Sequence, residues 1–333
     1  MSVLASIRAA RRGDSVMPVA VAVVLLHVLG WGTLLLAAAS GADAGGTTVL
    51  VLGLTAYAFG LRHAFDADHI AAIDNTTRTL QARGLPAKTV GFWFSLGHST
   101  VVFALCGLLA AGMGLVSTAL ADDGSLLHEI TGVWGPTVSS VFLVVLAAFG
   151  FASLLSHRDE SHGGPVWHAL SKTQRVIDRP SRMYVVGLLF GLGFDTATEI
   201  GLLALAGGSA ASGMPWWVAL SLPTVFAAGM SMLDTAQGAL AQRAYAYAPQ
   251  AGRRPGYARW MTAVSAVAAL VVAVIQLSGL AADHFDVAGP VAWLASLDLE
   301  DFGIGLTAVL LGTWACVAVV TIVRRRRGGD QAA

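Results

Sequence analysis

Charge is scarce in this chain of 333 residues, because Asp, Glu, Lys and Arg together make up only 12% of it. An average soluble domain carries about 25%. Hydrophobic residues account for 56% and the formal net charge is zero, so no nucleic-acid partner is expected. The mean hydropathy is +0.69. This composition leaves little room for a soluble domain and predicts an all-α, polytopic protein of the cell membrane, in contact with the lipid bilayer.

Cysteine is also scarce. Cys106 and Cys316, the two cysteines, both lie in apolar segments and are too few for a disulfide framework or a thiolate metal site. The glycines at 191–193 lack the Lys and the strand–helix context of a phosphate-binding loop, and no His-Glu-x-x-His run occurs. We therefore expect no enzyme, no prosthetic group and no ATPase subunit.

Long apolar runs are what the sequence has instead. Runs of about 20 residues predict transmembrane helices. Eight are present, at residues 17–39, 47–73, 89–118, 130–155, 183–207, 215–241, 259–281 and 303–323.

Lys and Arg alternate between the connections of these spans. They occur before the first span and after the second, fourth, sixth and eighth, but not in the other connections. By the positive-inside rule both termini are cytoplasmic. The chain then comprises an arm (1–16), one transmembrane domain (17–323) with a basic cytoplasmic loop (156–182), and a basic tail (324–333).

The second span contains an unusual charged segment, LRHAFDADHI at residues 61–70. A charge at the bilayer centre costs about 2.5–3.5 kcal/mol, so such a cluster predicts a functional site. An ideal helix turns about 100° per residue and places four of these residues within roughly 120°: Arg62, His63, Asp66 and His69. Asp68 lies nearly opposite, so it joins the same site only if the helix is distorted, and otherwise serves a separate partner.

Other spans add His98, the pair Asp195 and Glu199 four residues apart, and Asp234. These carboxylates give the interior of the predicted spans a negative charge that needs a counter-charge, which a divalent cation would supply. Imidazole and carboxylate ligands suit Ni, Co, Zn and Mn. Protons are the alternative, since carboxylate and His chains also relay protons.

Two motifs recur at a distance of three spans. FDADHI at 65–70 resembles FDTATEI at 194–200 with one residue inserted, and LGHS at 96–99 resembles AGMS at 228–231. A shift of three spans reverses direction in the membrane. The hypothesis is an inverted repeat in which spans 2–3 and spans 5–6 form two halves of one ion site.

These motifs resemble the nickel/cobalt transporter family of secondary permeases. RHAFDADHIAAIDNTTR (62–78) resembles the family's second-span signature, and FSLGHSTVV (94–102), LGFDTATEI (192–200) and AGMSMLDT (228–235) resemble its further motifs in the same order. The resemblance implies eight spans, cytoplasmic termini and uptake of Ni²⁺ and/or Co²⁺. Gln237 is a departure, because family members often have a second acid shortly after the acid at 234.

The family's signature positions fall on His63, Asp68 and His69, and its other polar motif positions on His98, Asp195, Glu199 and Asp234. With Asp66 from the helical arc, the predicted metal ligands are His63, Asp66, Asp68, His69, His98, Asp195, Glu199 and Asp234. Arg62 and His27 are assigned supporting roles.

Three alternatives remain open from the sequence. Export of the same metals would use the same ligand chemistry. His63, four residues, then Asp68 also fits the His-Asp pattern of membrane acyltransferases. The histidines of the fourth connection (His157, His162 and His168) could receive metal, although a solvated linker is the simpler interpretation.

Overall fold

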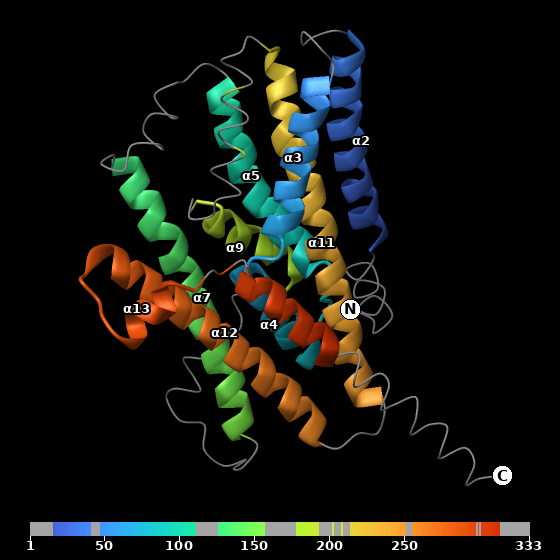
Figure 1. Cartoon of the computed structure of the whole chain (residues 1–333). Coiled ribbons are helices and arrows are strands. Elements are labelled where there is room, and N and C mark those ends of the chain that lie inside the picture. The colour runs from blue at the N-terminus through green and yellow to red at the C-terminus, as the bar shows by residue number, and fades with distance from the viewer. Residues whose placement is uncertain are drawn as a thin grey trace, which may run out of the picture.

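The structure is a computed structural model that describes residues 16–40, 47–110, 126–156, 178–192, 202, 208, 214–250, 255–297, 299 and 301–313. Helices dominate this part of the chain, and no strand occurs in it. The helices shown in Figure 1 are α2 (Met17–Ser40), α3 (Thr47–His63), α4 (Ala67–Ala82), α5 (Val90–Ala110), α7 (Leu126–Ser156), α9 (Met183–Phe190), α11 (Trp216–Gln250), α12 (Pro255–His284) and α13 (Pro290–Ala295). A 3-10 turn, η1 (Pro180–Arg182), precedes α9, and a further apolar helix covers Asp301–Thr313.

Five of the described helices are long and apolar enough to cross a membrane, and α3 with α4 makes a sixth if the bent pair is one span. The five segments are Met17–Ser40, Val90–Leu108, Val133–Leu155, Trp216–Tyr245 and Arg259–His284. The predicted spans 183–207 and 303–323 are described only in part. The multi-pass, all-helical class is confirmed, whereas the count of eight and the inverted repeat, half of which involves residues 194–200, stay predictions.

The prediction of one continuous helix over 47–73 was wrong. Helix α3 ends at His63, α4 begins at Ala67, and the two are bent by 53°. Asp66 has extended backbone angles (φ −60°, ψ 135°) at the N-cap of α4, a position that Asp favours. Two backbone hydrogen bonds between residues three apart turn the chain here. The N–H of Phe65 donates to the carbonyl oxygen of Arg62, and the N–H of Asp66 donates to that of His63. The arc calculated for an ideal helix therefore does not apply beyond His63.

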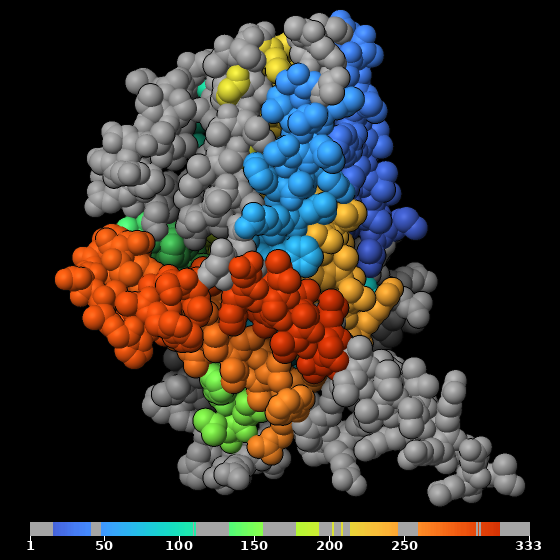
Figure 2. Space-filling view, viewed as in Figure 1, coloured from blue at the N-terminus to red at the C-terminus, as the bar shows by residue number. Residues whose placement is uncertain are grey.

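A glycine of the C-terminal helix packs directly on this break. A Cβ at Gly303 would lie 1.7 Å from the carbonyl oxygen of Phe65, so only a glycine fits there. The helix Asp301–Thr313, red in Figure 2, lies across the face of the molecule below α3. Tertiary packing thus covers backbone groups that the bend removes from a regular helix.

Helix α4 lies where two groups of helices meet. Helix α11 packs against α2, α3 and α5, and α12 packs against α7 and α13. Helix α4 contacts α5 and α11 on one side and α7 and α12 on the other. The residues at the start of α4 can therefore touch both groups.

Glycines bring α5 and α9 into backbone contact. A Cβ at Gly187 would lie 1.9 Å from the carbonyl oxygen of Phe94, and one at Gly97 would lie 2.0 Å from that of Tyr184. Small residues at helix crossings are the usual means of close packing in membranes. The crossing sets the position of α9 against the part of α5 that carries His98.

We expect Gly187→Ala to lower the unfolding temperature of the detergent-solubilised protein, because α9 must move away from α5. Overpacking of this kind costs about 1–3 kcal/mol. Gly279→Ala in α12 is the matched control, since nothing lies within 4 Å of a Cβ there. If circular dichroism gives the two variants the same unfolding temperature, the close crossing is not a feature of the folded protein.

Candidate metal site

Three imidazoles meet at the break between α3 and α4. His63 ends α3, His69 lies in the first turn of α4, and His98 projects from α5. One ligand nitrogen from each lies within 4.8 Å of the others, and the ring centroids are 4.5, 4.7 and 5.0 Å apart. All three residues are buried. Such a group of buried nitrogen donors can hold a transition-metal ion.

His63 makes the closest contacts in this cluster. Its Nε2 lies 2.9 Å from Nε2 of His98, and its Nδ1 lies 2.7 Å from Oδ2 of Asp66. A carboxylate beside one ring nitrogen fixes the tautomer and the orientation of a histidine, and leaves the other nitrogen for a metal. Asp66 is thus placed to direct Nε2 of His63 toward His98.

Asp234 lies beside His69. Its side chain is fully buried, and its Oδ2 is 3.9 Å from Nδ1 of His69. Neither carboxylate oxygen accepts a hydrogen bond from any residue that the structure describes. A Cβ at Gly91 would lie 1.9 Å from the carbonyl oxygen of Asp234, so α5 packs directly on the backbone that carries this acid. A buried carboxylate without hydrogen bonds is costly, and a cation in the imidazole cluster would offset that cost.

Aromatic rings surround the imidazoles. Phe94 packs edge-on against His69 with ring centroids 4.7 Å apart, Phe190 lies at 6.5 Å from the same ring, and Phe226 lies at 5.6 Å from His63. Such a shell excludes water and strengthens electrostatic interactions inside it. An ion bound here must exchange its water ligands for protein atoms.

Asp68 serves partners other than the imidazoles. Its Oδ2 accepts hydrogen bonds from Oγ of Ser139 (2.9 Å) and Nε2 of Gln276 (3.1 Å), and its Oδ1 accepts one from the backbone N–H of His69 (2.8 Å). Of the two alternatives left open by the sequence, the structure has the separate partner. Sequence reasoning missed Ser139 and Gln276, although each is a polar residue within an apolar span.

The other predicted residues lie apart from this cluster or outside the described residues. Arg62 is exposed on α3. Nε2 of His27 is hydrogen-bonded to the hydroxyl of Tyr57 at 3.1 Å, and its Nδ1 lies 2.8 Å from the carbonyl oxygen of Val23. Gln237 donates to the carbonyl oxygen of Ile70 (3.2 Å) and so links α11 to α4. Five predicted residues fall outside the described part of the chain: Asp195, Glu199, His157, His162 and His168.

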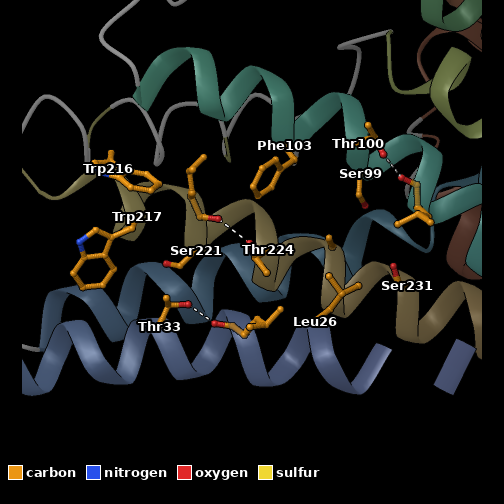
Figure 3. A pocket seen from close by; sticks show the side chains of 14 residues that line it. Leu26, Thr33, Ser99, Thr100, Phe103, Trp216, Trp217, Ser221, Thr224 and Ser231 are labelled. Carbon is orange, nitrogen blue, oxygen red and sulfur yellow. Dashed lines mark hydrogen bonds between the residues drawn. The ribbon is translucent and has the colours of Figure 1, made fainter. Parts of the chain in front are cut away.

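A separate cavity of about 490 Å³ lies between α2, α5 and α11, lined mainly by Leu, Phe and Trp side chains (Figure 3). Several of its hydroxyls are bonded within their own helices, as Thr100 is to the carbonyl oxygen of Leu96 (2.7 Å) and Thr224 to that of Leu220 (2.8 Å). The described residues that line it include no His, Asp or Glu, so the cavity offers an ion neither imidazole nor carboxylate. It does not extend the candidate metal site.

Apolar helices of membrane-spanning length, packed around a buried group of imidazoles and carboxylates, define a multi-pass membrane protein. Residues 49–320 match the family described as high-affinity nickel-transport protein (NicO). The chain belongs to this family, whose members are transporters and not enzymes. The family resemblance drawn from the four motifs is confirmed, and the acyltransferase alternative has no support.

Individual relatives agree along most of their length. The chain is 42% identical over 320 residues to the nickel transporter NicT of Mycobacterium tuberculosis, covering 90% of this chain and 86% of NicT. It is 37% identical to the nickel transporter NixA of Staphylococcus aureus (91% and 93% covered) and 36% identical to the cobalt transport protein NhlF of Rhodococcus rhodochrous (88% and 88%). No solved structure matches the chain.

Proposed function

We propose that this protein carries Ni²⁺ into the cytoplasm as a secondary transporter of the cell membrane, with Co²⁺ as a second cargo. The observation that carries the proposal is the convergence of His63, His69 and His98 in a buried site. Relatives named as nickel transporters and one named as a cobalt transport protein support the choice of metals.

The donor set suits these ions. Neutral imidazole binds Ni and Co well, whereas a soft ion such as Cu(I) prefers sulfur. Two nitrogen ligands at right angles on an ion, with bonds of about 2.0–2.1 Å, are about 2.9 Å apart. Nε2 of His63 and Nε2 of His98 have that separation, 2.9 Å, so the distance between them suits two ligands of one ion.

The carboxylates supply the charge that the imidazoles lack. Asp66 and Asp234, each beside an imidazole nitrogen, would together balance the two positive charges of the ion. Asp195 and Glu199 are proposed to act as further ligands along the transport path.

Inward transport needs no nucleotide. Moving a doubly charged ion inward gains about 4.6 kcal/mol per 100 mV of membrane potential, which is worth roughly three decades of concentration ratio. We propose the orientation with both termini and the basic loop 156–182 in the cytoplasm. Export would use the same ligands, so only the direction of net flux separates the two.

The test of direction is metal content in cells that express the full chain. We expect expressing cells to accumulate more ⁶³Ni²⁺ than vector controls, and collapse of the membrane potential to abolish the difference. Excess unlabelled Co²⁺ should compete, whereas Mg²⁺, which prefers oxygen ligands, should not. Lower metal content with raised nickel resistance would instead establish an exporter.

A further inference from the structure

We propose that Ser139 of α7 and Gln276 of α12 are positioning residues of the metal site, and that they act on it through Asp68. The inference rests on the proposed function, because it concerns the affinity of the imidazole cluster for its ion. It gives a role to α7 and α12, neither of which supplies an imidazole to that cluster.

Hydrogen bonds fix the orientation of the Gln276 amide. Its Oε1 accepts a hydrogen bond from Oγ of Ser140 at 3.2 Å and lies 3.0 Å from Oγ of Ser139, whose single proton is shared between this oxygen and Oδ2 of Asp68. Its Nε2 therefore faces Asp68 and donates to Oδ2 at 3.1 Å. Ser139, Ser140 and Gln276 are 2%, 0% and 4% exposed, so water does not compete for these bonds. Polar groups so buried in an apolar helix pair are costly unless every one is paired.

Asp68 connects these hydrogen-bonded side chains to the imidazole cluster. It is the second residue of α4 and accepts the backbone N–H of its neighbour His69 at 2.8 Å. A negative charge in the first turn of a helix is also stabilised by the helix dipole. The carboxylate thereby ties the start of α4 to α7 and α12, while the ring of His69 lies against His98 on the other side, 5.0 Å between centroids.

The position of His69 relative to His63 and His98 then depends on where α4 begins. Since the chain is bent between His63 and Ala67, no continuous helix holds His69 in register with His63. The bonds from Ser139 and Gln276 to Asp68 supply part of the missing constraint. Loss of such outer partners typically costs 10- to 100-fold in metal affinity.

The adjacent serines provide a matched pair for the test. Ser139 bonds Asp68 directly, whereas Ser140 reaches only Gln276 among the side chains that these hydrogen bonds connect. Both are buried in α7, so Ser139→Ala and Ser140→Ala each remove one buried serine hydroxyl from the same helix. We expect Ser139→Ala in the purified full chain to weaken Ni²⁺ binding about 10-fold by calorimetry, and Ser140→Ala, which keeps the Gln276 bond to Asp68 and the Ser139 bond to Asp68, to weaken it by a smaller factor.

The visible spectrum of bound Co²⁺ gives a readout that general destabilisation would not move, because it reports the geometry of the ligands. We expect the spectrum to change more in Ser139→Ala than in Ser140→Ala, because only Ser139→Ala removes a hydrogen bond to Asp68. Equal affinities and equal spectra in the two serine variants would overturn the inference.

Gln276→Leu tests whether the effect passes through Asp68. We expect it to weaken Ni²⁺ binding about 10-fold in the parent chain and to have little further effect in Asp68→Ala, because partners in one network are not additive. The same factor in both backgrounds would contradict the inference. If Asp68→Ala abolishes binding altogether, the serine pair decides.

Failure of this inference is distinguishable from failure of the proposed function. A parent protein that binds neither Ni²⁺ nor Co²⁺ would overturn the proposed function. A parent protein that binds Ni²⁺, with serine variants that do not differ, would overturn only the role of Ser139 and Gln276.

Discussion

Replacing His63 by Ala is expected to weaken Ni²⁺ binding by more than about 100-fold, beyond the 10- to 100-fold typical of losing an outer partner, and to abolish uptake. His63 is the central ring of the cluster, 4.5 Å from His69 and 4.7 Å from His98 between centroids. Its loss leaves two imidazoles and takes from Asp66 the nitrogen that lies 2.7 Å away. Calorimetry on the purified protein and ⁶³Ni²⁺ accumulation in cells measure the two effects.

His284→Ala is the control for this experiment. His284 is exposed at the end of α12, where its Nδ1 lies 2.9 Å from the carbonyl oxygen of Leu280. It is the same residue type in the same membrane protein, remote from the break between α3 and α4. We expect its removal to leave binding and uptake unchanged. An unaltered Ni²⁺ affinity in His63→Ala would show that the imidazole cluster is not where the ion binds.

The helices were predictable where long apolar runs determine them. The run at 17–39 corresponds to α2, Met17–Ser40, and the run at 259–281 lies within α12, Pro255–His284. The three histidines were named as candidate ligands from the sequence, because charged and imidazole side chains gathered inside apolar spans indicate a functional site. Each of these predictions depends only on the residues within a continuous segment of the chain, and the sequence alone provides that information.

The break after His63 was not predictable in this way. Residues 61–70 contain neither Pro nor Gly, the usual local signals of a helix end. The residue that packs on the bend, Gly303 against the carbonyl oxygen of Phe65, is far away in sequence. Asp66 is the N-cap residue of α4, but its side chain makes no capping hydrogen bond, and Asp in a charged segment does not by itself indicate an N-cap.

The partners of Asp68 were hidden for a related reason. Ser139 and Gln276 are polar residues in two apolar spans, and such residues commonly hydrogen-bond across helices, but the sequence does not indicate to which residue. Only the packing of α4 against α7 and α12 brings them to Asp68. Contacts between segments this far apart do not follow from periodicity in any one of them.

Charge compensation, rather than the number of ligands, distinguishes Asp234 from the histidines. An exposed carboxylate is stabilised by water, but Asp234 is fully buried and accepts no hydrogen bond from the described residues. This buried carboxylate destabilises the folded protein when no ion is bound and stabilises it when a dication lies in the cluster beside His69. Stability without metal and affinity for metal should therefore respond in opposite directions to loss of this charge.

Asp234→Asn, which keeps the shape and removes the charge, is expected to reduce Ni²⁺ affinity about 10- to 100-fold while leaving the metal-free protein as stable as before or more so. Calorimetric titration gives the affinity, and thermal unfolding with and without Ni²⁺ gives the two stabilities. Asp178→Asn is the control, because that exposed carboxylate pairs with Arg182 at 3.1 Å and exposed pairs contribute about 0–1 kcal/mol. If Asp234→Asn instead destabilises the metal-free protein and leaves the affinity intact, this acid serves the packing of α11 and not the ion. The opposite signs are expected because the same buried charge that burdens the empty site is what attracts a doubly charged ion into it.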